Sequence, residues 1–423
     1  MPRVTKVQIS PSKNVINLHR LINVMLPKCK FKEKEIMILY AGYFPVYPIN
    51  NGFNVNEREI IETLLKHKFN LTYIQGNGAN YSDYPENFRK ILKIVPLLKF
   101  RGRLKLLNYV YFWLYIIQHV LHIKKLYKPI LIFFGPDLVV PGVFLKKILG
   151  LPYIASLGDS WLPYDSKIVK ASKFRYNSIT LFEKVSKYAS KIVLVSSREA
   201  KYLYEHGFNN KKIVVDQLSG FGINKKILDI REEIREKILL ELNINSECKL
   251  VFFHGVTTYK INTATFEEIC NRIAPKIEKI DDKIIFVLAG GNLNEAGISY
   301  KSGNIISLGY IGDREKLASY LVSADLYILP IELGSGVKTK LLEAINAGIP
   351  ILTTEFIKRE YEGNPPFILA KMGDFPEKIV DTLNNENLMR SLRTKTLEYS
   401  KYLNNTEHKP LINAINDILS SMG

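Results

Sequence analysis

The stretch 330–354, PIELGSGVKTKLLEAINAGIPILTT, places a glycine-rich turn directly before an amphipathic segment that carries lysines at its start. The free N–H groups at the beginning of a helix are partially positive, so lysines are unfavourable there unless an anion is also bound. An anion bound by the amides after Gly334, Ser335 and Gly336 would contact Lys338 and Lys340 as well as the helix N-terminus. The pattern therefore predicts an anion-binding turn.

Glu343 follows this turn and adds a carboxylate to the same helix. It lies seven residues beyond Gly336, which is about 10 Å along the axis at ~1.5 Å per residue. At that distance a carboxylate can accept hydrogen bonds from ribose hydroxyls while phosphates occupy the helix start. The alternative is a solvated helix whose lysines form ion pairs with Glu343 or Glu332.

Short apolar runs alternate with longer amphipathic segments, as in parallel sheets that helices cover on both faces. The sequence predicts strands at 35–41, 69–74, 129–135, 152–158, 191–197, 212–217, 249–255, 283–291, 304–311, 325–330 and 349–354. Helices are predicted between them, among others at 55–68, 143–150, 182–189, 198–206, 263–279, 313–323 and 337–347. The fold class is therefore α/β, with two doubly wound, Rossmann-like domains.

The segment GFGINKK interrupts the alternation near residues 220–225 and marks the domain boundary. We expect an N-terminal domain over residues 1–222, of which 1–33 form an extension, and a C-terminal domain over 223–400. The tail 387–422 is typical of helices, and we expect residues 401–423 to pack back on the N-terminal domain.

Two further glycine turns follow predicted strands of the second domain, at Gly255 and at Gly290. Ligands of doubly wound sheets bind beyond the carboxyl ends of the strands, where such turns lead into helices. The chain has neither the G-x-G-x-x-G pattern of dinucleotide-binding proteins nor a G-x-x-x-x-G-K-[ST] phosphate loop. NAD-dependent enzymes and P-loop NTPases are therefore disfavoured.

Charge is distributed unevenly between the two halves. Residues 1–225 contain 35 Lys and Arg against 14 Asp and Glu, whereas residues 226–423 contain 24 against 27. The strong basic excess of residues 1–225 favours contact with an anionic phospholipid surface, a polyphosphate carrier or nucleic acid. In region 98–128 basic residues flank aromatic ones, which fits either a helix docked on anionic lipid or a helix packed in the core. Its uncharged run 106–123 has four polar residues and is a poor membrane span.

The three cysteines are scattered, which argues for a reducing compartment and against a zinc site. The N-terminal residues have no apolar segment of the kind that a signal peptide needs. No Asp-x-Asp pair occurs in either half. We therefore expect a protein without cofactor or metal in the cytoplasm, peripheral to the cytoplasmic face of the membrane.

The stretch 330–354 resembles the donor-binding segment of the retaining GT-B-fold glycosyltransferases of the "group 1" type, in which a proline and a glycine-rich turn precede L-E-A-x-x-x-G-x-P. Further segments agree in order and spacing, namely KIVLVSSREAKYLYEHGF, FFHGVTTYKIN, FVLAGG and LGYIGDREKLASYLVSADLYILP. The resemblance covers about residues 35–400 and is strongest in the second half. It implies a GT-B fold, with the two domains facing each other across a cleft.

The resemblance implies a role for several residues of the second half. Glu343 would bind the ribose of a UDP- or GDP-sugar, and the amides of residues 334–337, which end at Val337, would bind its diphosphate together with Lys340. Lys260, five residues after Gly255, would be the other phosphate contact. The glutamate that this family often has eight residues before Glu343 is replaced by Ser335, which leaves the donor sugar open.

On the acceptor side, AGYFPVYPINNGF resembles the glycine-containing loop after the first strand, with Gly52 and Phe53 as candidates. SLGDSWLP follows a strand that ends at the cleft, and it supplies Asp159 and Trp161. Asp159 is also a candidate catalytic group with Lys260 and Lys340; a helix-capping or turn aspartate is the alternative.

The function implied is metal-independent hexosyl transfer with retention of configuration, from a nucleotide-diphosphate sugar to a lipid-linked or membrane-associated acceptor in glycan or polysaccharide biosynthesis. Two alternatives stay open. One is a nucleotide-sugar epimerase or hydrolase on the same fold, and the other is a non-enzymatic basic binding protein. No nucleic-acid-binding module is recognisable, so nucleic acid is not the expected partner.

Overall fold

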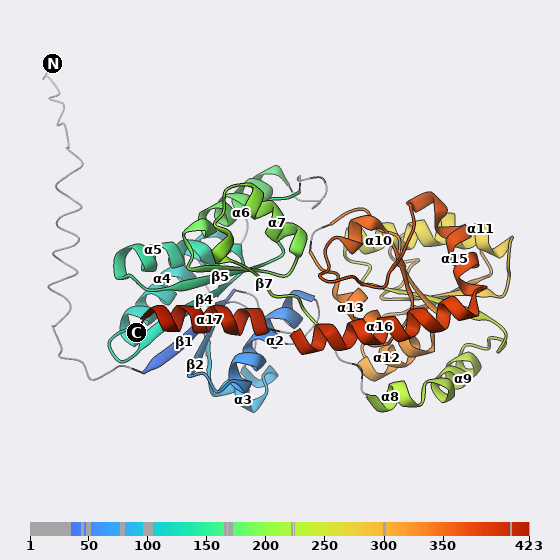
Figure 1. Cartoon of the computed structure of the whole chain (residues 1–423), viewed down its shortest axis with the longest axis horizontal. Helices are drawn as coiled ribbons and strands as arrows, with labels where there is room; N and C mark the ends of the chain where they lie inside the picture. Colours follow the sequence, from blue (N-terminus) through green and yellow to red (C-terminus); the bar gives the residue numbers. More distant parts are fainter. Residues whose placement is uncertain are drawn as a thin grey trace, which may run out of the picture.

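The computed structural model describes residues 35–43, 46–47, 52–76, 81–95, 105–164, 167, 172–220, 223, 225–298, 302–334, 336–406 and 408–422, with the side chains of 52–55, 105, 106 and 225 left aside. These residues form two α/β domains that lie side by side along the long axis of the molecule (Figure 1). Residues 1–33 and Ser335 lie outside the described part, so the expectations for them stay expectations.

The N-terminal domain is built on a seven-stranded parallel sheet in the order β3-β2-β1-β4-β5-β6-β7. Its strands are β1 (Ile36–Gly42), β2 (Leu71–Gln75), β3 (Leu92–Ile94), β4 (Lys128–Phe134), β5 (Tyr153–Gly158), β6 (Lys191–Leu194) and β7 (Ile213–Val215). In β1, Leu39 packs into the core on one face of the sheet and Ile38 and Tyr40 into the core on the other. Because side chains alternate along a strand, such double burial produces the continuous apolar runs seen in the sequence.

Helices cover both faces of this sheet. One face packs against α4 (Lys105–Ile123), α5 (Val139–Leu149) and α7 (Ser197–Glu205), with α6 (Lys173–Val185) beside α5. The other face packs against α2 (Gly52–Lys66), α3 (Glu86–Arg89) and α17 (Lys409–Met422) (Figure 1).

The C-terminal domain has a six-stranded sheet in the order β10-β9-β8-β11-β12-β13, again with parallel pairs. Its strands are β8 (Lys249–His254), β9 (Ile284–Ala289), β10 (Ile305–Gly309), β11 (Leu326–Leu329), β12 (Ile351–Thr353) and β13 (Ile368–Leu369). Its helices are α8 (Lys225–Asp229), α9 (Arg231–Glu241), α10 (Lys260–Glu268), α11 (Ala274–Glu278), α12 (Arg314–Ser323), α13 (Thr339–Asn346), α14 (Glu355–Lys358), α15 (Phe375–Leu383) and α16 (Glu386–Thr406). The predicted fold class is therefore confirmed.

The chain returns to the N-terminal domain later than the expected residue 401. That residue lies inside α16, which is packed on α13 and α15 of the C-terminal domain. The return begins at His408, which has a left-handed backbone (φ 51°) and starts the turn into α17. His408 Nδ1 lies 2.8 Å from Asp216 Oδ2, and both side chains are buried. The apolar stripe of α17, with Leu411 and Ile415 fully buried, then completes one core of the first domain.

Several predicted boundaries were wrong by a few residues. The helix expected at 337–347 begins only at Thr339, because Lys338 is its extended N-cap residue (φ −88°, ψ 106°). The short edge strands β3 and β13 were missed, since two or three residues give no periodic signal.

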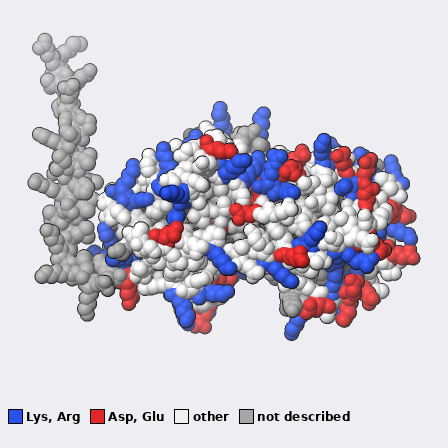
Figure 2. All heavy atoms as spheres, viewed as in Figure 1, with Lys and Arg blue, Asp and Glu red and all other residues white. Residues whose placement is uncertain are grey.

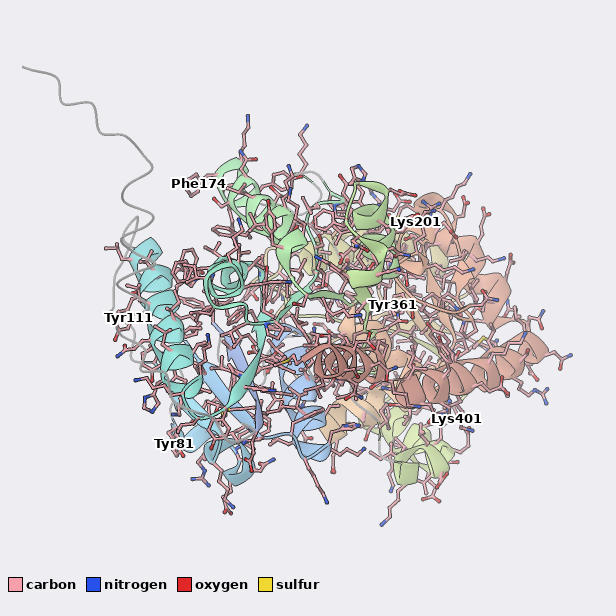
Figure 3. All side chains as sticks on the ribbon, turned by 60° about the vertical axis from the view of Figure 1, so that its left-hand side comes forward. Tyr81, Tyr111, Phe174, Lys201, Tyr361 and Lys401 are labelled. Carbon is pink, nitrogen blue, oxygen red and sulfur yellow. The ribbon has the colours of Figure 1, made fainter. Side chains whose placement is uncertain are left out.

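Within region 98–128, residues 105–123 form α4, and the two faces of this helix fit the two interpretations of the sequence. Phe112, Ile116 and Val120 are fully buried against the sheet. Leu114 on the opposite side is 60% exposed, and Tyr111 projects outward at the edge of the molecule (Figure 3). Among the described helices, none combines the length and apolar character that crossing a membrane requires. Figure 2 shows the charge asymmetry: basic side chains are spread over the N-terminal domain, and acidic ones gather at the far end of the C-terminal domain.

Candidate active site

The carboxyl ends of β8 and β9 lead into two turns that touch each other. Gly255 N donates to Ala289 O (2.9 Å), and Gly290 N donates to Gly309 O (2.7 Å). Gly290 has φ 133°, and a Cβ there would lie 2.0 Å from Gly255 O. An L-residue would be strained at this angle and would also collide with backbone, so the turn at Gly290 requires glycine. The predicted glycine turns are thereby brought to one place.

The turn before α13 lies at the same end of the sheet, after β11. Gly334 and Gly336 have φ values of 100° and 65°, which explains why glycines occur at both positions. Val337 is buried, and Ile261 of α10 contacts Gly334 from the side. The described residues Gly334, Gly336 and Val337 thus lead into the N-terminus of α13.

The two lysines near this turn have different hydrogen-bond partners. Lys340 Nζ donates to the Asn262 side chain and lies 5.1 Å from the centre of the Phe253 ring. Lys338 Nζ donates to Gly336 O at 3.0 Å. The pKa of Lys340 is lowered to about 7, mainly by burial and also by Lys338, while Glu343 opposes the shift. A bound anion would restore the favourable protonated form of Lys340.

Glu343 faces the same space from the next turn of α13. Its Oε2 lies 2.7 Å from His254 Nε2, and the Tyr327 hydroxyl lies 3.3 Å from His254 Nδ1. Glu343 also acts electrostatically on Arg314 of α12. One carboxylate oxygen therefore has a defined partner within the protein.

Lys260 is the first residue of α10, and its side chain is exposed. The neighbouring residue that the structure places at the turn is Asn262, which the sequence reasoning missed. Asn262 Nδ2 donates to Val256 O at 2.9 Å while its Oδ1 accepts from Lys340. An asparagine in the first turn of a helix gives no distinctive signal, because solvated asparagines are common there.

Across the cleft, Asp159 of the N-terminal domain lies against the glycine turn of the other domain. A Cβ on Gly336 would be 1.7 Å from Asp159 Oδ1, so the carboxylate contacts the glycine directly. Although solvent reaches the Asp159 side chain, atoms of both domains surround it. Desolvation by these atoms is the largest cause that raises the pKa of Asp159 to about 6; Lys338 opposes the shift, and Glu360 adds to it. Asp159 is therefore no simple helix cap, but a carboxylate at the junction of two domains.

Two buried glutamates fix the loop that carries Asp159. Glu199 accepts from Ser160 N (2.9 Å), and Glu183 accepts from Trp161 N (2.9 Å) and Ser160 Oγ (3.1 Å). Burial raises the pKa of Glu183 to about 7, which its hydrogen bonds oppose. Ser196 and Glu199 have the Ser-x-x-Glu spacing of a capping box. Ser196 does cap α7, but the carboxylate of Glu199 turns to Ser160.

The aromatic candidate Trp161 is partly exposed, and its ring lies 5.5 Å from the Arg175 guanidinium. Gly52 and Phe53 are the first residues of α2, and their side-chain positions lie outside the described part of the chain. The acceptor-side expectations for Gly52, Phe53 and Trp161 therefore stay expectations.

Glu360 of the C-terminal domain joins the domains close to this loop. It is 1% exposed and accepts from Tyr164 Oη (2.8 Å), Ser196 Oγ (2.5 Å) and Arg198 Nη1 (3.2 Å), all of the N-terminal domain. The adjacent Tyr361 lies at the centre of the molecule (Figure 3), with its hydroxyl on the Lys338 backbone. Sequence reasoning had no signal for this contact, since a partner in another domain leaves no local pattern.

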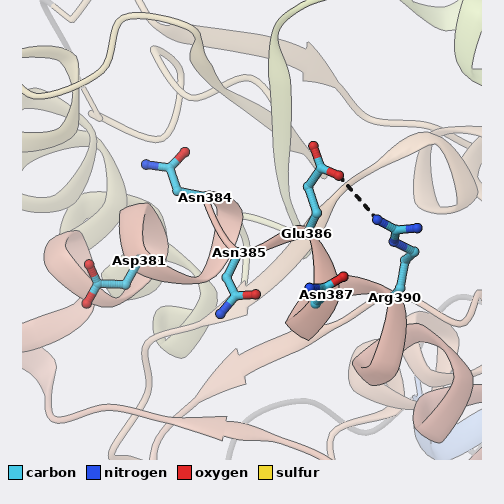
Figure 4. Close-up of a pocket in the computed structure, with 6 residues that line it drawn as sticks. All are labelled: Asp381, Asn384, Asn385, Glu386, Asn387 and Arg390. Carbon is cyan, nitrogen blue, oxygen red and sulfur yellow. Dashed lines mark hydrogen bonds and ion pairs between the residues drawn. The ribbon is translucent and has the colours of Figure 1, made fainter.

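A hollow lies at the junction of α15 and α16, apart from the turns described above (Figure 4). It is lined by Asp381, Asn384, Asn385, Glu386, Asn387 and Arg390. Its charged pair, Glu386 and Arg390, is exposed and spaced i, i+4 on one helix. Among the described residues, no group of three or more His, Cys, Asp or Glu side chains is arranged to bind a metal ion. The candidate site is therefore the interdomain one.

Comparison with known proteins gives consistent matches. The family model "Glycosyl transferases group 1" matches residues 248–385. The chain is 25% identical over 279 residues to N,N'-diacetylbacillosaminyl-diphospho-undecaprenol alpha-1,3-N-acetylgalactosaminyltransferase of Campylobacter jejuni, covering 62% of this chain and 70% of that protein.

Solved structures share the two-domain arrangement. HepE of Anabaena, in complex with UDP and glucose, matches with a TM-score of 0.62 and 11% identity. The match covers 91% of this chain and 98% of the HepE chain. Sucrose-phosphate synthase of Thermosynechococcus elongatus has a TM-score of 0.66 and 13% identity, with coverages of 92% and 99%. The GT-B fold expected from the sequence is confirmed.

Proposed function

We propose that the donor of this glycosyltransferase is a nucleoside-diphosphate sugar. The observation that carries the proposal is the cluster around the turn before α13. Three features surround one space there. They are Lys340, whose pKa is lowered, the glycines with positive φ, and the carboxylate of Glu343, which His254 orients. Lysine and backbone amides suit a diphosphate, and a carboxylate suits ribose hydroxyls.

In the proposed reaction, the bond between the anomeric carbon and the diphosphate oxygen breaks, and a bond to an acceptor hydroxyl oxygen forms. Lys340 and the amides of residues 334–337 stabilise the negative charge of the leaving diphosphate. Asp159 faces the same turn from the N-terminal domain, where it contacts Gly336 and can hydrogen-bond the sugar or the acceptor. We propose that the transfer proceeds with retention of configuration and without a metal, as the family resemblance implies.

For the acceptor we propose a lipid-linked saccharide at an anionic membrane. The Campylobacter jejuni relative is named for a diphospho-undecaprenol substrate. In this chain, residues 87–158 contain 12 lysines and arginines and one acidic residue, Asp137. They include α4 and α5, which present an apolar hollow of about 750 Å³ lined by residues such as Leu121 and Phe144, with Lys125 at its edge. Apolar side chains bordered by lysines are suited to the surface of an anionic bilayer.

The test begins with thermal-shift screening of UDP-, GDP- and ADP-sugars, since a ligand that binds the folded state raises its stability. Release of the nucleoside diphosphate from the best donor is then measured with and without membrane lipid extract. We expect release that depends on the extract, and loss of donor binding in Glu343→Ala but not in the exposed control Glu377→Ala.

Other outcomes would favour the alternatives. Turnover of the donor without any acceptor would indicate an epimerase or hydrolase. Absence of nucleotide-sugar binding together with salt-sensitive binding of nucleic acid would indicate a basic binding protein.

A further inference from the structure

His254 is the last residue of β8 and directly precedes Gly255. Its ring lies between Glu343 of α13 and Tyr327 of β11, with distances of 2.7 Å from Nε2 to Glu343 Oε2 and 3.3 Å from Nδ1 to the Tyr327 hydroxyl. His254 is 8% exposed and Tyr327 is fully buried. The histidine therefore links Tyr327 of the sheet to Glu343, which is the carboxylate that α13 contributes to the candidate donor site.

These two contacts define the direction of the hydrogen bonds. A carboxylate only accepts, so the ring nitrogen that faces Glu343, Nε2, carries a proton and donates to it. Burial raises the pKa of Tyr327 well above its usual value, so its hydroxyl keeps a proton that it can donate to Nδ1. A carboxylate oxygen has two lone pairs, so Glu343 still accepts further hydrogen bonds from a ligand.

Without this contact, the Glu343 side chain has competing partners. The Lys340 ammonium and the Arg314 guanidinium both interact electrostatically with it. An ion pair with Lys340 would neutralise the cation that the diphosphate needs, and it would also turn the carboxylate away from the ribose. The contact with His254 holds the carboxylate in place and leaves the charge of Lys340 available.

We propose that His254 is a positioning residue for ribose recognition, and that Tyr327 in turn fixes the His254 ring. The inference rests on the proposed function, because the ribose belongs to the donor. It predicts that His254, acting through Glu343, affects the affinity for ligands that contain a ribose. The affinity for a diphosphate alone should not depend on His254.

The test measures the affinity of UDP or GDP, whichever the wild-type protein binds, and of inorganic pyrophosphate, by calorimetry. His254→Ala should weaken the nucleoside diphosphate about tenfold, the value of a hydrogen bond to a charged group, and leave pyrophosphate unchanged. His254→Gln, whose amide nitrogen can replace Nε2 as a donor, should recover most of the loss. The double variant of His254→Ala and Glu343→Ala should bind like Glu343→Ala alone.

Tyr327→Phe is the second variant, since it keeps the ring in the core and removes only the hydroxyl. It should weaken the nucleoside diphosphate in the same direction but less than His254→Ala. Equal weakening of both ligands, or additive effects of the two alanine substitutions in folded variants, would overturn the proposal. If the wild-type protein bound neither nucleotide, the proposed function would fall first, and this inference with it.

Discussion

The surroundings of Lys340 explain why a lysine occurs in the first turn of α13. In the unliganded protein it is half-buried, hydrogen-bonded to Asn262 and close to Lys338, and these surroundings lower its pKa to about 7. Protonating Lys340 therefore costs free energy in the folded protein, and an anionic ligand would offset this cost. A lysine in this state is suited to binding a phosphate group rather than to stabilising the fold.

This state predicts proton uptake when the diphosphate binds. Near pH 8 a lysine with a pKa of about 7 is mostly neutral, and the anion favours its protonated form. UDP or GDP affinity should therefore fall as pH rises from about 7 to about 9, and calorimetry in buffers of different ionisation enthalpy should report proton uptake.

Lys340→Met should weaken binding at neutral pH at least tenfold, the value of a charge-assisted hydrogen bond, and should remove this dependence on pH. Lys279→Met, at an exposed lysine of the same domain, is the control. An affinity that stays constant over this range of pH in the wild-type protein would contradict the assignment of Lys340 to the diphosphate.

At the scale of elements, the site depends on turns that approach each other more closely than side chains allow. Gly290 packs against the Gly255 carbonyl, and the two turns together form the floor beneath the N-termini of α10 and α13. Glycine at position 290 is thus required by a tertiary contact as well as by the local backbone angle.

Gly290→Ala should displace both turns and reduce nucleotide affinity more than tenfold, because the new Cβ would overlap backbone atoms. Gly297→Ala is a matched control: this glycine also has positive φ (75°), but a Cβ there meets nothing within 4 Å. The control should lose only about 1 kcal/mol of stability and keep its affinity. Equal affinity losses in the two variants would show that backbone strain, not the contact, matters.

The helix α4 shows how one element can serve two purposes. Its inner face completes the core of the first domain, while its outer face exposes Leu107, Val110, Tyr111, Leu114 and Leu121 beside lysine-rich segments. Apolar side chains on the outside of a core helix carry no folding benefit, which supports contact with a membrane surface.

Leu114→Glu should therefore reduce binding to vesicles that contain phosphatidylglycerol about tenfold, since an inserted leucine contributes roughly 1.5–3 kcal/mol. Leu240→Glu, at an 81% exposed leucine of α9 in the other domain, should have no effect. Co-sedimentation with phosphatidylglycerol and with pure phosphatidylcholine vesicles measures both. Equal binding to the two lipids would argue against the electrostatic part of this contact.

At the scale of the whole molecule, Glu360 is one of the residues that join the two domains. It brings a buried carboxylate of the C-terminal domain to three donors of the N-terminal domain, next to the loop of Asp159. The distance between Asp159 and the glycine turn therefore depends on an interdomain contact and not on either domain alone.

Glu360→Ala should lower the free energy of unfolding by about 3 kcal/mol, since it leaves the partners of a buried charge unsatisfied. Hydrogen exchange should become faster around residues 196–198, while nucleotide affinity stays within a few-fold because its contacts lie in one domain. Arg359→Ala, which removes an exposed i, i+4 pair with Glu355, should change stability by less than about 1 kcal/mol. Unchanged exchange in Glu360→Ala would show that other contacts set the domain arrangement.

The sequence by itself determined the two parallel α/β domains, the glycine turns and the candidate residues Lys340 and Glu343. These features follow from local rules: double-sided burial produces apolar strands, and left-handed backbone angles require glycine. The tertiary structure alone decided that His254 lies on Glu343, that Asn262 lies on Lys340, and that Glu199 lies on the loop of Asp159. These partners are 89, 78 and 39 residues apart, and contacts over such separations depend on how strands are ordered and domains packed, which no local pattern of residues records.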